Sequence, residues 1–244
     1  MQFSVKSAAA MAAALAIAAG PAQASVTVNA AASIYDAGNV SPLYGSSLPP
    51  AISILAGTSF LQFSNVIGSD TCAASTSGCI TINGGGNFND ADGNGAAVSS
   101  SNSTGAGSIS GIIAPGAGYL VGLFVAAGGP SGAAPFAPNF LPGGISFASL
   151  APQLDQTFFI GDGLTGDGTG SVQNFYVPTG ATALYLGISD ACSYSGAPSC
   201  YSDNTGTFSV TVSAGASPSV PEPQSWTLLA AAVALLSLRR RRPG

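Results

Sequence analysis

Residues 206–213, with the sequence Gly-Thr-Phe-Ser-Val-Thr-Val-Ser, carry the clearest structural signal in this chain of 244 residues. The apolar side chains of Phe208, Val210 and Val212 alternate with those of threonine and serine. Successive side chains of a β-strand point to opposite faces, so this alternation predicts a strand with one buried and one solvent-facing side.

Apolar segments of similar length recur along the chain, and the body between its two ends shows no helical periodicity. The nearly continuous apolar run at 119–127 predicts a central strand, whereas the Gly-, Ser- and Pro-rich segments 84–108 and 128–144 predict loops. Short strands in this number predict an all-β domain, a β-sandwich of the jelly-roll or galactose-binding-like kind. The other expected strands are an opening one within 25–36, then 51–57, 58–67, 80–82, 157–160, 172–177 and 183–189.

All basic residues lie at the two ends of the chain, as Lys6 and the run Arg239, Arg240, Arg241 and Arg242, and the chain has no histidine. The body between them is acidic and cannot neutralise phosphates, so we expect no nucleic-acid partner. Because the body has no His, Lys or Arg, Ser-His-Asp triads and lysine chemistry are excluded. No pair of Asp stands out by its spacing as a glycosidase pair. These residues favour a protein that is not an enzyme.

Residues 1–24 have the pattern of a secretory signal peptide, expected to be helical. Lys6 is followed by an apolar run at 8–19, and Ala22-Gln23-Ala24 forms a small-x-small cleavage site before Ser25. The apolar run is shorter than the roughly 20 residues needed to span a membrane. The sequence therefore predicts export and removal of residues 1–24.

The C-terminal segment 220–244 combines three features in order. Pro221, Glu222 and Pro223 precede a largely apolar stretch at 225–238, and the four arginines 239–242 follow. The stretch would make a helix of roughly 21 Å, which is short for a bilayer core of about 30 Å. We expect a short transmembrane helix that stops at the arginines on the cytoplasmic side, with the body outside the membrane.

This combination resembles the PEP-CTERM sorting signal of exported proteins from Gram-negative bacteria that make exopolysaccharide. The resemblance implies that an exosortase, a membrane transpeptidase, cuts at the Pro-Glu-Pro motif after transient anchoring in the inner membrane. The product would then pass to the cell surface or the extracellular matrix. We accordingly divide the chain into the signal peptide, a β-sandwich domain at 25–213, a linker at 214–219 and the sorting signal at 220–244.

Four cysteines, Cys72, Cys79, Cys192 and Cys200, lie in the exported part, where disulfides are expected. Three pairings are open, and the local bridges 72–79 and 192–200 are the simplest of them. Closing so short a loop stabilises the fold by roughly 2.5 kcal/mol in the loop-entropy model. A zinc site is disfavoured, since neither spacing is Cys-x2-Cys and histidine is absent.

Two polar motifs in the body imitate known ligand sites. Residues 90–95 match the first half of an EF-hand loop, but Ser101 stands where the bidentate Glu is required. Residues 161–166 match the spacing Gly-x-Gly-x-x-Gly, yet the following segment holds further Gly and Pro and cannot supply the helix that a nucleotide site needs. We interpret both motifs as turn-rich loops, with a looser calcium loop left open at 90–95.

The most informative constellation joins Asp190 with Asp203 and Asn204. Asp190 follows the predicted strand 183–189, and Asp203 and Asn204 precede the predicted strand 206–213. A closed Cys192–Cys200 loop would bring these oxygen-bearing side chains together. Carboxylates and amides are ligands that calcium takes. The alternative interpretation is that Asp and Asn cap a tight turn.

Segments 158–163, 177–178, 184–190 and 201–210 resemble the calcium-dependent galactose-binding lectins of the bacterial PA-IL type. The resemblance implies a small β-sandwich in which Asp190, Asp203 and Asn204 hold calcium. It also implies that Tyr201, Asp203 and Asn204 lie at the ligand, a galactose-like glycan or exopolysaccharide. This chain departs from the pattern in its Cys-closed loop and in having Asp203 where Asn is usual.

The sequence leaves two functions open. The first is an exported, surface-sorted, calcium-dependent carbohydrate-binding module at the envelope or in the exopolysaccharide matrix. The second is a structural envelope or biofilm matrix protein without a small-molecule site, which the abundant Gly, Ser and Thr and the low charge fit equally well.

Overall fold

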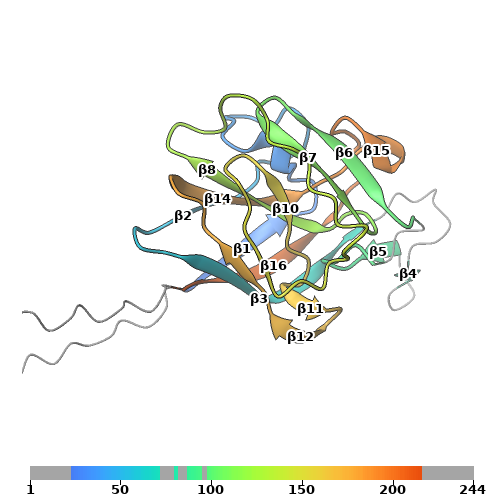
Figure 1. Ribbon diagram of the computed structural model, residues 1–244. Helices are drawn as coiled ribbons and strands as arrows, with labels where there is room; N and C mark the ends of the chain where they lie inside the picture. Colours follow the sequence, from blue (N-terminus) through green and yellow to red (C-terminus); the bar gives the residue numbers. More distant parts are fainter. Residues whose placement is uncertain (1–22, 72–79, 82–86, 95–97, 216–244) are drawn as a thin grey trace, which may run out of the picture.

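The structure, a computed structural model, describes residues 23–71, 80–81, 87–94 and 98–215 (Figure 1). This part of the chain is built from strands and two short 3-10 turns, η1 (Ile34–Asp36) and η2 (Cys192–Tyr194), and has no α-helix. None of its helical segments is long and apolar enough to cross a membrane. The predicted transmembrane helix at 225–238, and all of the predicted signal peptide except Gln23 and Ala24, fall outside the described residues.

The larger sheet is mostly antiparallel and has the order β1-β16-β3-β13-β9, with β5 and β4 continuing from β3. Its longest pairing joins β3 to β16, and β1 covers the other edge of β16. The bounds are β1 (Gln23–Asn29), β3 (Phe60–Thr71), β4 (Ile80–Thr81), β5 (Asn87–Asn89), β9 (Ser149–Leu150), β13 (Asn174–Tyr176) and β16 (Gly206–Gly215).

The second sheet has the order β10-β8-β14-β2 and is antiparallel throughout. Its strands are β2 (Ala51–Ser53), β8 (Leu120–Ala126), β10 (Thr157–Phe159) and β14 (Ala181–Ile188). A three-stranded sheet of β6 (Ser101–Ala106), β7 (Ile109–Ala114) and β15 (Ser195–Gly196) and a hairpin of β11 (Leu164–Gly166) and β12 (Thr169–Val172) complete the described fold.

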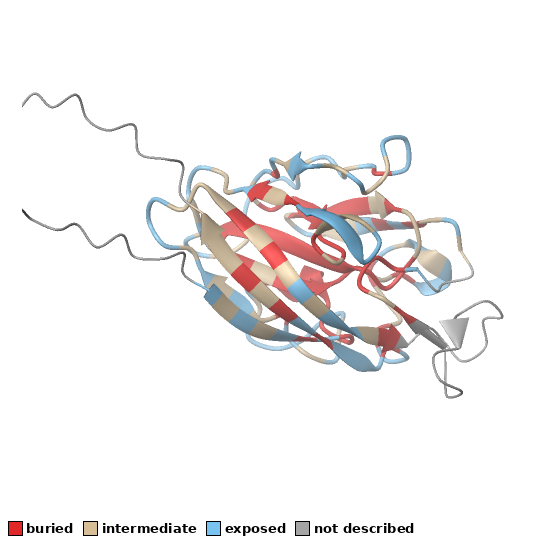
Figure 2. Cartoon of the chain, turned by 90° about the horizontal axis from the view of Figure 1, so that it is seen from below, coloured by how far each residue is buried: buried red, intermediate tan, exposed pale blue. Residues whose placement is uncertain are grey.

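The two larger sheets enclose one apolar core. Alternate residues of β16 and β3, including Phe208, Val210 and Phe63, meet side chains of β8 and β14 there. Figure 2 shows the resulting alternation of buried and less buried positions along the strands. The aromatic rings pack closely, as in the pair Phe63–Phe175, whose ring centroids lie 5.0 Å apart.

Strand β8 is buried on both faces. Leu120 and Phe124 enter the core between the sheets, whereas Val121, Leu123 and Val125 enter a second cluster with residues of β7 and η1. This explains the almost continuous apolar run at 119–127, because a strand with two covered faces has no wet side to alternate with. Position 122 in this strand has no room for a side chain, since a Cβ on Gly122 would lie 2.5 Å from the Phe158 ring.

The prediction of an all-β body is confirmed for the described residues, and the strand at 206–213 is confirmed and extends to Gly215. The predicted loop at 84–108 is wrong, because it contains β5 and β6. Strand β6 is composed of small and polar residues, and its buried Ser101 donates to the Tyr119 hydroxyl at 3.0 Å. The apolar pattern therefore could not reveal it.

Two expected boundaries also move. The opening strand ends at Asn29, whose side-chain oxygen accepts a hydrogen bond from the Ala31 backbone N–H and turns the chain. Ala214 and Gly215, expected in the linker, belong to β16 and pair with Leu61 and Phe60 of β3.

The core predicts a clear contrast between two phenylalanines. Phe63 is fully buried and Phe136 is 68% exposed. Phe63→Ala should lower the free energy of unfolding by about 3–5 kcal/mol through lost burial and the cavity left behind. The matched control Phe136→Ala should change it by less than about 0.5 kcal/mol. Urea unfolding followed by far-UV circular dichroism measures the free energy of unfolding of both variants. Equal decreases in the two variants would contradict the assigned core.

Candidate functional site

Tyr201 supports the end of β14 from inside the protein. Its side chain is 1% exposed. Its hydroxyl donates to the backbone oxygen of Ile188 at 3.1 Å and accepts from the backbone N–H of Asp190 at 2.9 Å. Burial raises the pKa of this phenol well above its ordinary value. Tyr201 thus positions Asp190, which differs from the ligand contact that the lectin resemblance implies for its side chain.

The loop between Asp190 and Tyr201 is closed by the predicted Cys192–Cys200 disulfide, which is confirmed. Ser199 ties the loop further, since its hydroxyl oxygen accepts from the Cys192 N–H at 3.0 Å and its own N–H donates to the Asp190 carbonyl. The bridge expected between Cys72 and Cys79 lies outside the described residues.

The Asp190 carboxylate and the Asn204 amide meet directly. One carboxylate oxygen, Oδ1, accepts from the Ala191 N–H at 2.7 Å, and the other accepts from Asn204 Nδ2 at 3.2 Å. The same Nδ2 donates to the backbone oxygen of Ala30 at 3.3 Å. Two oxygen atoms therefore converge on one amide group at the junction of β1, β14 and β16.

Asp203 stands beside this pair with an exposed side chain. Burial raises the pKa of Asp190 to about 6, and the charge of Asp203 adds to the increase. The structure thus brings all three predicted calcium ligands to one corner, as the disulfide loop suggested. Within the described part of the chain, no three Asp, Glu, His or Cys side chains gather closely enough to hold a metal ion, so a cation here would also need amide and carbonyl oxygens.

An open cavity of about 430 Å³ is lined in part by the disulfide-closed loop. It is lined by polar residues from two parts of the chain, Val98, Ser99, Ser100 and Asn102 on one side and Ser193, Tyr194 and Ser195 on the other. The two sides meet because β15 pairs in parallel with β6. This pairing joins segments about ninety residues apart without an apolar pattern, so the sequence did not indicate the cavity.

The two polar motifs at 90–95 and 161–166 meet in the structure. Asp92 Oδ1 accepts from the Asp162 N–H at 2.9 Å, and Asp90 Oδ1 accepts from the N–H groups of Asp92 and Asn94. Burial, with the nearby charge of Asp162, raises the pKa of Asp92 to about 7. The second half of the 161–166 motif is strand β11, and β12 rather than a helix follows it, so the motif opens a hairpin.

A further buried carboxylate, Asp36, was not singled out from the sequence. It is fully buried and accepts hydrogen bonds from the backbone N–H groups of Leu43, Tyr44 and Gly45 and from Asn39 Nδ2. The bonds fold residues 37–45 back over η1. The only sequence signal was an isolated Asp after an apolar pair and before a segment rich in turn residues.

Comparison of the chain with protein-family models, curated proteins and solved structures found no match.

The raised pKa of Asp190 predicts how stability changes with pH. The folded state holds this proton up to about pH 6, whereas an unfolded Asp loses it near pH 4. Between these values the folded state binds more protons, so the free energy of unfolding falls as pH rises. Asp190→Asn should flatten this fall, measured by urea unfolding from pH 4 to 7 in EDTA.

An unchanged slope in Asp190→Asn would contradict the buried, raised-pKa environment. Asp92→Asn is the second informative variant. The pKa of Asp92 is raised to about 7, so its effect on the free energy of unfolding extends to a higher pH than that of Asp190.

Proposed function

We propose that the protein is an exported, non-enzymatic carbohydrate-binding module of the cell surface or exopolysaccharide matrix, with calcium at Asp190, Asp203 and Asn204. The observation that carries the proposal is the convergence of Asp190 Oδ2 and the Ala30 carbonyl on the Asn204 amide. In this reading the fold is a jelly-roll or galactose-binding-like β-sandwich.

The amide nitrogen of Asn204 occupies the place that a cation would take between these oxygens. The Asn204 side chain would have to turn over and draw back, so that the ion takes the place of Nδ2 and binds Asn204 Oδ1. Asp190, Asn204 and the Ala30 carbonyl would then supply oxygen ligands, and the exposed Asp203 lies close enough to raise the pKa of Asp190. Calcium accepts mixed carboxylate, amide and carbonyl shells of six to eight oxygens.

The sugar would complete the calcium shell, and the cavity lined by residues 193–195 of the disulfide loop offers it further polar groups. That cavity presents serine hydroxyls, the Asn102 amide and Tyr194, a set that can hydrogen-bond hydroxyl groups without charge. A neutral glycan also suits a body that carries nine Asp and no cation, because anionic polymers would be repelled.

In the sequence, the proposed site and the sorting signal lie beyond opposite ends of strand β16. Asn204 lies two residues before β16 begins, and the tail follows its last residue, Gly215. Ten residues of strand span roughly 30 Å. Anchoring by the predicted PEP-CTERM tail before exosortase cleavage would therefore direct the Asp190 corner away from the inner membrane.

One observation favours the second candidate, a structural matrix protein without a small-molecule site. Asn204 already provides a hydrogen bond to Asp190, so the corner is satisfied without a cation. In that reading the three residues close the sheet end and the protein contributes packing surface alone.

Calcium titration distinguishes the two candidates. The full chain, purified in a detergent without a sugar headgroup, should release saturable heat with CaCl2 in isothermal titration calorimetry, and its melting temperature should rise. Asp203→Ala removes one exposed carboxylate and should weaken calcium binding at least about tenfold, since a charged ligand is lost. Asp167→Ala removes an exposed carboxylate elsewhere and should bind as the parent does.

Absence of calcium heat in the parent, with an unchanged melting temperature, would reject the calcium site and favour the structural role. Methyl galactoside titrated with calcium and again with EDTA then tests the sugar separately.

A further inference from the structure

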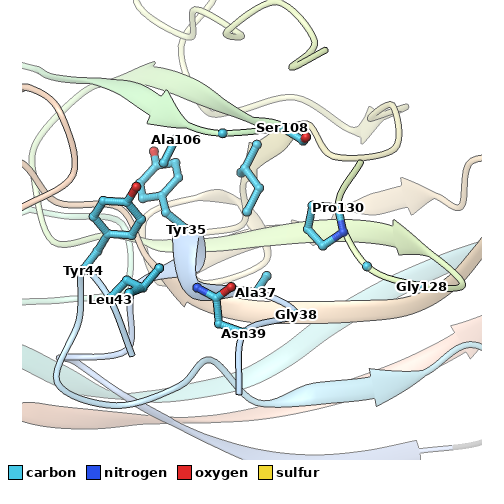
Figure 3. Close-up of a pocket in the computed structure, with 13 residues that line it drawn as sticks. Tyr35, Ala37, Gly38, Asn39, Leu43, Tyr44, Ala106, Ser108, Gly128 and Pro130 are labelled. Atoms are coloured by element: carbon cyan, nitrogen blue, oxygen red, sulfur yellow. The ribbon is translucent and has the colours of Figure 1, made fainter. Parts of the chain in front are cut away.

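A second pocket of about 280 Å³ lies apart from the disulfide loop (Figure 3). It opens between the segment 37–44, the turn joining β6 to β7, and the loop Gly128–Pro130. Figure 3 shows Tyr44 and Leu43 on one side and Pro130 on the other, with Ser108 at the β6–β7 turn.

The walls of this pocket are held by buried carboxylates. Asp36 binds the backbone N–H groups of residues 43, 44 and 45, which fixes one wall. Asp155 accepts from the Ser131 N–H at 3.1 Å, and the Ser108 hydroxyl donates to the Gly132 carbonyl at 2.7 Å, which fixes the loop behind Pro130. A cavity held by such bonds is present before a ligand arrives, so little ordering is needed on binding.

The side chains of Leu43 and Tyr44 reach the surface beside the pocket. The Asp36 bonds engage only their backbone, and the side chains are 73% and 38% exposed. Neighbouring apolar side chains that a fixed loop presents beside a cavity favour a ligand-contact surface. Here they face a pocket whose remaining walls offer the Asn39 amide, the Ser108 hydroxyl and glycine backbone.

The chemistry of the pocket favours a neutral saccharide. None of the lining residues, all of them described, carries a carboxylate, an ammonium or a guanidinium group. An aromatic ring and aliphatic carbons suit the C–H face of a sugar, and amide, hydroxyl and backbone groups suit its hydroxyls. The volume is at the lower end for ligand sites, which points to a ring or two and excludes a long groove-bound polymer.

We propose that this pocket is a calcium-independent binding site for a neutral saccharide, formed by Leu43, Tyr44, Asn39, Ser108 and Pro130. It is separate from the Asp190 corner and does not require it. One hydrogen bond links the two sites. The hydroxyl of Tyr35, which lines the pocket, lies 2.9 Å from Ser189 Oγ, and Ser189 precedes Asp190 in the sequence. Its test must therefore separate the two sites.

The experiment titrates the full chain, in sugar-free detergent and with EDTA present, with the methyl glycosides of galactose, glucose and mannose, followed by saturation-transfer NMR and calorimetry. At least one glycoside should bind saturably without calcium. Methyl galacturonate, the anionic counterpart of methyl galactoside, should bind more weakly than the neutral glycoside. Tyr44→Ala should reduce the affinity about tenfold through loss of the ring contact.

Two further variants control for structure. Leu43→Ser changes an even more exposed side chain and should weaken binding in the same direction, so the test survives if one variant misfolds. Tyr176→Ala removes an exposed tyrosine of β13, on the larger sheet, and should bind as the parent does.

The proposal is overturned if no glycoside binds in EDTA up to tens of millimolar, or if Tyr44→Ala and Leu43→Ser bind like the parent. Sugar binding that needs calcium and is unaffected by these variants would also overturn it and would assign the sugar to Asp190. Loss of calcium binding in Asp203→Ala, by contrast, leaves this pocket untouched.

Discussion

The absence of any cation from the body of this protein governs how its carboxylates are accommodated. A buried carboxylate is destabilising unless it is paired or hydrogen-bonded, and no Lys, Arg or His lies between Lys6 and Arg239. Backbone N–H groups take that role instead, for at least six of the nine Asp. Each such bond fixes a loop, as Asp36 does for residues 43–45, so acidic residues here act as loop anchors.

This arrangement explains why a chain with so many turn residues has defined surfaces. The two larger sheets and the doubly buried β8 supply the apolar core. The loops above them are held by Asp36, Asp155 and the Asp92–Asp162 contact, where charge-assisted hydrogen bonds are stronger than neutral ones. Both proposed sites lie where such an anchored loop meets a strand end, because a fixed loop can present side chains that the core does not need.

The Asp190 corner differs from the other anchors in one respect. At Asp36, Asp90 and Asp162 the carboxylate is surrounded by donors from its own loop. At Asp190 one oxygen reaches across to Asn204, a second carboxylate stands nearby, and the Ala30 carbonyl shares the same amide. The calcium proposal rests on this grouping of oxygen atoms around one amide. Asp90, Asp92 and Asp162 form a second group of neighbouring carboxylates.

The sequence by itself determined the all-β class of the body and the strands at 119–127 and 206–213, because alternation and continuous burial are local properties. It offered Cys192–Cys200 as part of the simplest of three pairings, and the structure decided that bridge. It also indicated that Asp190, Asp203 and Asn204 meet. Strand β6, the Asp36 anchor and both cavities were decided by the tertiary structure alone. The Asp36 bonds reach only to residues 39–45, and the β6–β15 pairing joins distant segments, but both are made by polar groups. Polar groups carry no periodic apolar pattern that would reveal their partners.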